Sequence, residues 1–222
     1  MQGYIGFLHQ YGSRFVHGTI FTVEQTVLAI VLAVVIALVM ALLKMAPYFF
    51  LRYPAIAFIE VFRGTSLLVQ LYWIFFVLPL FGLSLDKFTA GFLAVGMNLG
   101  AYGAELVRGG IQSVPRGQYE AAIALNLPPV AKFTRVIFPQ ALLIMLPPWG
   151  NLLIELLKGT ALVSLISVTD LMFEAKQINA STFLSAQAFG TALVIYYVLG
   201  RLVVSPAMRG LENRLAQKLS RG

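Results

Sequence analysis

Three pairs of acidic and basic residues recur along the chain at a spacing of three. They are Glu60 with Arg63, Glu105 with Arg108, and Glu155 with Lys158. Residues three apart share one face of a helix, so each pair can neutralise itself. We expect the first two pairs at cytoplasmic helix ends. For Glu155 and Lys158 two interpretations stay open: mutual neutralisation, or one anionic and one cationic contact for a zwitterionic solute.

Other residue types exclude several kinds of chemistry. The sequence has no cysteine, which rules out disulfides, thiolate metal sites and cysteine nucleophiles. Its two histidines, His9 and His17, precede the first long apolar stretch, and neither HExxH nor GxSxG occurs. The nucleotide-binding pattern GxxxxGK[ST] does not occur either. We therefore expect a chain that is not an enzyme and that binds no metal, cofactor or nucleotide itself.

The composition is that of an integral membrane protein. Of 222 residues, 59% are hydrophobic and 11% are charged, against about a quarter charged in soluble domains. A net charge of +7 would suggest nucleic acid as a partner of a soluble protein. Here membrane topology explains the basic residues better, and we expect no nucleic-acid partner.

Five segments are long and apolar enough to cross a bilayer, which takes about 20 mostly apolar residues. They are 25–43, 64–83, 88–107, 137–158 and 184–204. The second is entered through an amphipathic stretch, 53–63. Segment 159–183 is too polar in its second half to span, and we expect a re-entrant or surface helix there. The sequence thus predicts an all-α membrane protein with five transmembrane helices.

Prolines and glycines predict the shapes of these helices. Pro139 and Pro147–Pro148 interrupt the fourth span, which we expect to be kinked or discontinuous. The fifth span should end before Pro206. In the third span, Gly96 and Gly100 form a pair of small residues four apart, which lets two helix backbones approach closely.

The basic residues predict the orientation, because cytoplasmic loops are enriched in lysine and arginine. With the N-terminus outside and the C-terminus inside, 11 of the 16 basic residues face the cytoplasm: Lys44, Arg52, Arg108, Arg116, Lys132, Arg135, Arg201, Arg209, Arg214, Lys218 and Arg221. We divide the chain into an outer or interfacial segment 1–18, a transmembrane domain 19–207 and a basic cytoplasmic tail 208–222.

A polar stretch, GQYEAAIALNLPP at 117–129, falls in the cytoplasmic loop between the third and fourth spans. Ser113 can cap a helix here, and Glu120 places negative charge near the helix start. Asn126 and Pro128–Pro129 should end it. We expect a short exposed helix at about 117–127, rich in small residues on one face, that a groove on another protein could accept closely.

Several sequence blocks form an ordered set. They are EVFRGTSLLVQLYWIFFVLP at 60–79, NLGAYGAELVRGGIQSVPRGQYEAA at 98–122, RVIFPQALLIMLPP at 135–148, WGNLLIELLKGTALVSLISVTDL at 149–171 and LENRL at 211–215. Together with EAAIALN at 120–126, this set resembles the permease subunits of ABC importers. Within these it resembles the polar amino-acid uptake family, a histidine/glutamine permease-like family of binding-protein-dependent inner-membrane components. The blocks cover most of residues 18–215.

The resemblance implies a fold, a mechanism and partners. It implies the type I ABC importer permease fold in the bacterial inner membrane, with ATP–Mg bound by a separate ATPase dimer. Helix 117–127 would be the coupling helix seated in that ATPase, through Gly117, Glu120, Ala121, Ala122 and Asn126. A second, identical or similar permease subunit and an extracytoplasmic solute-binding protein are also implied.

Candidates for the substrate path are Asn98, Tyr102, Asn151, Glu155 and Lys158. For Asn98 and Tyr102, which share a helix face, a helix–helix hydrogen bond is the favoured alternative. Where the family commonly has Lys-Asp-Thr-Ser-Leu, this chain has KGTAL, with Gly159 and Ala161 in place of the acid and the hydroxyl. An amino acid is the expected solute; ectoine, hydroxyectoine or an opine is the alternative. A channel or secondary transporter that needs no ATP is the alternative of another class.

Overall fold

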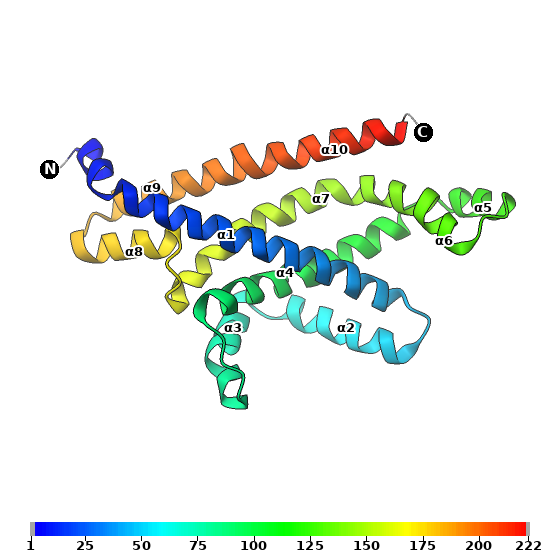
Figure 1. The fold of residues 1–222 in the computed structure, drawn as a ribbon, viewed down its shortest axis with the longest axis horizontal. Coiled ribbons are helices and arrows are strands. Elements are labelled where there is room, and N and C mark those ends of the chain that lie inside the picture. The colour runs from blue at the N-terminus through cyan, green and yellow to red at the C-terminus, as the bar shows by residue number, and fades with distance from the viewer. Residues whose placement is uncertain (1–2, 221–222) are drawn as a thin grey trace.

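The computed structural model describes residues 3–220, with side chains up to Gln217, and this part of the chain contains helices and no strand (Figure 1). The elements are α1 (Tyr4–Met45), α2 (Phe49–Gly64), α3 (Leu67–Tyr72), η1 (Trp73–Val77), η2 (Leu78–Phe81), α4 (Lys87–Gln112), α5 (Arg116–Ala124), α6 (Pro129–Ala131), η3 (Lys132–Ile137), α7 (Phe138–Gly159), η4 (Thr160–Ile166), α8 (Leu171–Thr182), α9 (Ser185–Val198), η5 (Leu199–Val204) and α10 (Ser205–Ser220).

The centre of the bundle is the contact between α1 and α4. A row of alanines four residues apart on α1, from Ala29 to Ala41, is fully buried. On α4, a Cβ atom at Gly96 or Gly100 would lie 2.8 Å from the side chain of Leu32 or Ile36. Small residues on both helices therefore let the two backbones approach closely.

Four helical segments of the described chain are long and apolar enough to span a membrane, and the pair formed by α2 and the helices after it makes up to five. This pair is where the structure departs from the predicted second span, 64–83. The chain bends by 109° at a break after Gly64. The segment 67–81 then projects from the bundle as an arm (Figure 1). The break therefore lies at the start of the predicted span, and the bent pair forms a broken span or a re-entrant loop.

Three prolines sit within continuous helical paths. Pro79, Pro139 and Pro206 each come two residues after the end of a π-helical segment: η1, η3 and η5. A proline ring clashes with the carbonyl four residues earlier in an α-helix. The wider π-helical turn relieves this clash, since its hydrogen bonds skip one further residue. The helix therefore continues past Pro206, whereas the point at which the membrane span ends stays a prediction.

The fourth span is also continuous. Pro147 and Pro148 lie inside α7, which runs unbroken from Phe138 to Gly159, so of the two predicted alternatives a discontinuous helix is absent, and a kink stays a prediction. In a membrane bundle, neighbouring helices and local adjustments compensate for the lost backbone hydrogen bonds.

Segment 159–183 forms a short 3₁₀ helix, η4, followed by α8. Asp170 caps α8 by accepting a hydrogen bond of 2.8 Å from the backbone N–H of Phe173. Helix α8 buries Leu171 and Ile178 in a second apolar cluster shared with α9 and the N-terminal turns of α1, including Phe7. α8 and α5 lie at opposite ends of the molecule (Figure 1).

Candidate functional site

Helix α5 is tied to both of the long helices that flank it. The Tyr119 hydroxyl donates to the carbonyl of Ile111, at the end of α4, at 3.0 Å. Gln140 Nε2, on α7, donates to Gln118 Oε1 at 3.1 Å. These two hydrogen bonds connect α5 to α4 and to α7.

The start of α5 differs from the prediction. Ser113 does not cap it, because its hydroxyl donates back to the Gly109 carbonyl at 2.8 Å. Pro115 occupies the N-cap position, and no side chain caps the helix there. A serine in the last turn of a helix commonly bonds to the carbonyl four residues earlier, and this local partner competes with the cap.

The end of α5 is a Schellman turn. Asn126 has a φ of 52°, and its N–H donates to the Ile123 carbonyl at 2.8 Å. The next N–H, of Leu127, donates to the Ala122 carbonyl at 3.1 Å. This is the turn that usually takes glycine, and asparagine is the residue that adopts it next most readily.

The outward face of α5 carries small residues and the charges of Arg116 and Glu120, which lie four residues apart. Gly117, Glu120 and Ala121 are exposed, and no described atom would touch a Cβ at position 117. Glu120 forms no hydrogen bond or ion pair with any residue that the structure describes. Ile123 and Leu125 beside it are 62% and 74% exposed. A shallow groove on another protein could hold this face at close range.

Behind α5, an ionic cluster joins α1 to α4. Lys44 Nζ lies 2.6 Å from Glu105 Oε1, and Arg108 Nη2 lies 2.7 Å from Glu105 Oε2. Arg108 Nη1 also donates to Gln112 Oε1 at 2.6 Å. The spacing of three predicts the contact of Glu105 with Arg108. The contact with Lys44, 61 residues earlier, has no local signal in the sequence.

Three of the predicted path residues share one exposed face of α7. Asn151, Glu155 and Lys158 line a hollow of about 430 Å³ together with Ile154. Glu155 and Lys158 form no ion pair with each other or with any other described residue, so the structure does not bear out mutual neutralisation, one of the two interpretations left open by the sequence. Charges on an exposed face of a membrane helix need a water-filled path or a second subunit beside them.

A second hollow, of about 310 Å³, continues this face. It shares Asn151 and Ile154 with the first hollow and adds Arg201, Arg209 and Glu212 from η5 and α10. From the sequence, Arg201 and Arg209 indicated only which side of the membrane the last segment faces. They lie beside Asn151 because the last helix continues through Pro206.

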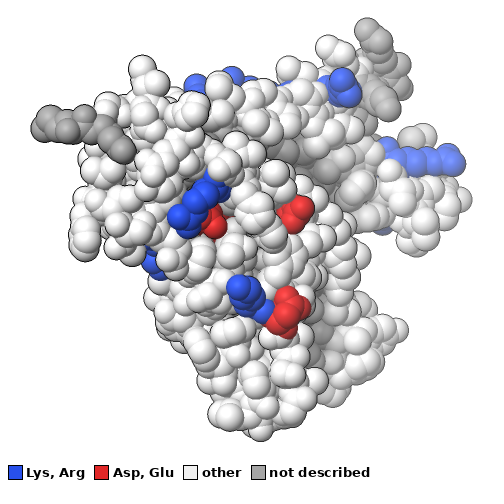
Figure 2. Space-filling model, turned by 60° about the vertical axis from the view of Figure 1, so that its left-hand side comes forward, with Lys and Arg blue, Asp and Glu red and all other residues white. Residues whose placement is uncertain are grey.

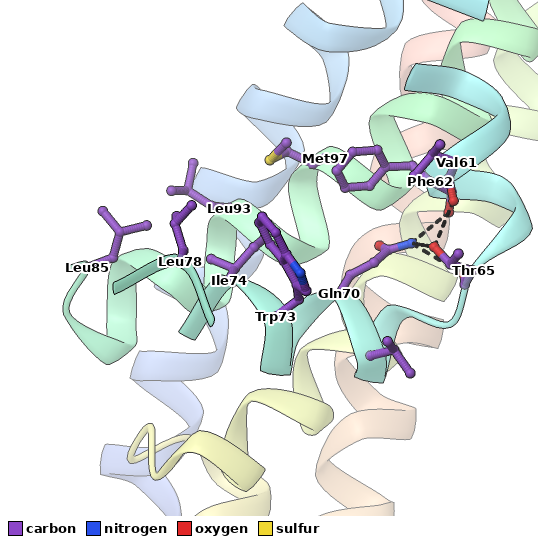
Figure 3. Close-up of a pocket in the computed structure, with 11 residues that line it drawn as sticks. Val61, Phe62, Thr65, Gln70, Trp73, Ile74, Leu78, Leu85, Leu93 and Met97 are labelled. Carbon is purple, nitrogen blue, oxygen red and sulfur yellow. Dashed lines mark hydrogen bonds between the residues drawn. The ribbon is translucent and has the colours of Figure 1, made fainter. Parts of the chain in front are cut away.

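Asn98 is not part of this face. Its Nδ2 atom donates to the Phe62 carbonyl at 3.0 Å and to Gln70 Oε1 at 2.9 Å. Gln70 Nε2 in turn donates to Thr65 Oγ1 at 2.7 Å (Figure 3). The network supplies hydrogen-bond partners for backbone groups that the break between α2 and α3 leaves free. Asn98 thus forms a hydrogen bond between helices, which is the interpretation that the sequence favoured.

An apolar groove of about 450 Å³ lies beside this network, between α2, the arm and α4 (Figure 3). Trp73, Ile74 and Met97 are among its lining residues. The polar side chains at its edge, Gln70 and Thr65, already bond to each other. The groove therefore lacks free polar groups for a zwitterion.

Tyr102 contacts Arg63 in two ways. Its hydroxyl donates to the Arg63 carbonyl at 3.3 Å, and Arg63 Cζ lies 5.4 Å from the centre of its ring. Arg63 was expected at a cytoplasmic helix end and paired with Glu60. Both expectations are wrong: it lies level with the middle of α4, and it forms no ion pair with a described residue. The break after Gly64 ends α2 beside the middle of α4.

Charges are sparse on the molecular surface. Figure 2 shows one face on which a few basic and acidic groups, some of them side by side, interrupt uncharged atoms. Such a surface suits contact with lipid over most of its area. The few exposed charges on the membrane helices therefore need a polar environment.

Comparison with known proteins gives concordant results. The family model described as "Binding-protein-dependent transport system inner membrane component" matches residues 27–217. The chain is 40% identical over 215 residues to the probable amino-acid ABC transporter permease protein y4tF of Sinorhizobium fredii, covering 94% of this chain and 90% of that protein. It is 39% identical over 163 residues to the glutamine transport system permease protein GlnP of Escherichia coli, covering 72% and 74%. It is 33% identical over 198 residues to the L-cystine transport system permease protein TcyB of Bacillus subtilis, covering 89% and 85%.

Solved structures are similar as well. The crystal structure of an amino acid ABC transporter with histidines superposes with a TM-score of 0.88 at 37% identity, covering 96% of this chain and 99% of that one. An inward-facing MetNI methionine ABC transporter, 20% identical, has a TM-score of 0.78 and covers 93% and 98%, which is a likeness of fold alone.

Proposed function

Because the chain belongs to the family of binding-protein-dependent transport system inner membrane components, we propose that it pairs with an identical or similar subunit to form the path of an amino acid or amino-acid derivative through an ATP-driven importer. The chain is a multi-pass inner-membrane permease subunit of an ABC transporter and is not itself an enzyme. The partners and the solute are the proposal.

The observation that carries the proposal is the outward face of α5. It combines small residues with one unpartnered acid, Glu120, on a helix bonded to both α4 and α7. We infer that this face seats in a cytoplasmic ATPase dimer that binds ATP–Mg. Closure of that dimer would then move α4 and α7 together, which is a rigid-body route between inward-facing and outward-facing states.

The exposed polar face of α7 supports the pairing with a second permease subunit. Asn151, Glu155 and Lys158 lie on a membrane helix without covering residues. Facing lipid, each charge would cost roughly 2.5–3.5 kcal/mol on insertion scales. A second subunit opposite this face would enclose a polar path. We propose that a solute-binding protein delivers the solute at the α8 end, with the N-terminus outside and α5 and the C-terminus inside.

The solute class rests on the relatives, whose names specify glutamine and L-cystine. We propose a zwitterionic amino acid. Gly159 and Ala161 stand where the family pattern has an acid and a hydroxyl. The absence of the acid disfavours binding of cationic amino acids. A cyclic zwitterion such as ectoine or hydroxyectoine, or an opine, is the second candidate on the same observation.

The test is a charge reversal on α5. The complex of permease, ATPase and binding protein is reconstituted in proteoliposomes, and ATP hydrolysis and uptake of labelled glutamine, cystine and ectoine are measured. Glu120→Lys should lower both activities at least about tenfold, because it opposes a basic contact at close range. Glu24→Lys makes the same change on an exposed side chain at the outer end of the first span and should leave coupling intact. Unchanged hydrolysis and uptake in Glu120→Lys would contradict the assignment.

A further inference from the structure

Arg63 is a cation in the bundle for which the described chain provides no acid. It is exposed, and neither Glu60, three residues earlier, nor any other described carboxylate lies within ion-pair distance. Its guanidinium lies over the ring of Tyr102, 5.4 Å from the ring centre. A ring face attracts the cation but leaves its N–H donors, which point outward in the guanidinium plane, free to bind an anion.

Arg63 lies beside the middle of α4 and not at one of its ends. Tyr102 lies 15 residues from Lys87 and 10 from Gln112, the two ends of α4. At about 1.5 Å per residue, the ring is within about 4 Å of the middle of the helix. Glu105, which pairs with Lys44, is only three residues from Tyr102, so lipid phosphate is a competing anion, and protection of position 63 by the solute separates the two.

The surroundings of Arg63 lead towards the polar face of α7. Leu67, four residues after Arg63, lies 3.2 Å from the position of a Cβ on Gly159. Gly159 directly follows Lys158, and Gly103, next to Tyr102, lies against the ring of Trp149 on α7. These contacts place the segments next to Arg63 and Tyr102 against α7, the helix that presents the exposed charges. A charge within a membrane bundle faces a water-filled path far more often than lipid.

We propose that Arg63 is a substrate-contacting residue that binds the carboxylate of the solute. The inference rests on the proposed function, since it needs an anionic group to pass along this path. A guanidinium suits the task because it can donate two parallel hydrogen bonds to a carboxylate. The ring of Tyr102 packs against the guanidinium.

The chain has no cysteine, which permits a direct test of access. Arg63→Cys is introduced into the reconstituted complex and treated with a membrane-impermeant sulfonate methanethiosulfonate reagent, with the unmodified complex as background. We expect labelling that slows several-fold during transport of the solute. Val31→Cys, on a lipid-facing side of α1 that is 59% exposed, should stay unlabelled. An Arg63→Cys variant that resists the reagent, or that labels at the same rate with and without solute, would overturn the proposal.

A second measurement separates contact with the solute from a packing role. Arg63→Gln should lower uptake by roughly tenfold or more, as expected for loss of a charge-assisted hydrogen bond, while stimulation of the ATPase by the binding protein persists. Arg63→Lys should restore part of the uptake. Normal uptake by Arg63→Gln, or equal loss of uptake and of assembled complex in both variants, would reject the assignment. If the unmodified complex transports no amino acid or related zwitterion, the proposed function fails first, independently of Arg63.

Discussion

Lys44 Nζ on α1 lies 2.6 Å from Glu105 Oε1 on α4, with both side chains largely buried. Glu105 also accepts hydrogen bonds from Arg108, which in turn donates to Gln112, the last residue of α4 before the loop that leads to α5. The contact closes a chain of polar interactions from the first span to the segment that we propose to receive the motion of the ATPase.

The first prediction concerns this ion pair. A double-mutant cycle with Lys44→Met and Glu105→Gln, measured by thermal unfolding of the purified complex, should give a coupling free energy of about 1–3 kcal/mol. Removing one partner alone is costly because it leaves a buried charge unpaired. The pair Arg14–Glu174 has a similar N–O distance, 2.7 Å, but a more exposed arginine. Its cycle should give less than about 1 kcal/mol. Equal coupling in the two pairs would contradict the role of burial.

The second prediction compares two glycines of α4. A Cβ at position 103 would lie 2.7 Å from Cη2 of Trp149 and 2.9 Å from the Ala37 side chain, whereas one at position 109 would meet nothing within 4 Å. Gly103→Ala should lower the unfolding free energy by about 1–3 kcal/mol through overpacking. Gly109→Ala should leave it unchanged or raise it by up to about 1 kcal/mol, since alanine favours the helix. Similar melting temperatures for both variants would mean that α1, α4 and α7 are packed more loosely.

The third prediction is a pH dependence at α8. Asp170 is fully buried, and burial raises its pKa from 3.8 to about 6. The native state therefore holds this proton more tightly than the unfolded chain. The resulting stability is present below pH 4 and is lost as pH rises through about 6, by up to about 3 kcal/mol.

Asp170→Asn isolates this effect, because asparagine keeps an acceptor for the Phe173 N–H but cannot ionise. We expect the melting temperature of the variant, relative to the unmodified complex, to rise between pH 5 and pH 8. A difference that does not change with pH would show that the carboxyl titrates at its ordinary value.

Local sequence patterns predicted the parts of this structure that depend on neighbours along the chain. The small pair Gly96 and Gly100 indicated the closest helix contact, and the polar loop at 117–129 indicated α5. What they could not reveal depends on tertiary position. The break after Gly64 places Arg63 beside the middle of α4. The contact of Lys44 with Glu105 joins two segments that share no local sequence pattern. The π-helical turns before Pro139 and Pro206 likewise need the backbone itself.

The last prediction concerns the turn that ends α5. Asn126 adopts a φ of 52°, which glycine accepts without strain and a β-branched residue resists. Asn126→Gly should keep uptake unchanged, whereas Asn126→Val should destabilise the turn by about 1–3 kcal/mol. Amide hydrogen exchange reports this locally, because the Leu127 N–H donates to the Ala122 carbonyl only in this turn. We expect Asn126→Val to lose protection at Leu127 and to hydrolyse ATP with less uptake per ATP. If valine leaves both protection and uptake intact, the left-handed turn is not what fixes α5 for coupling.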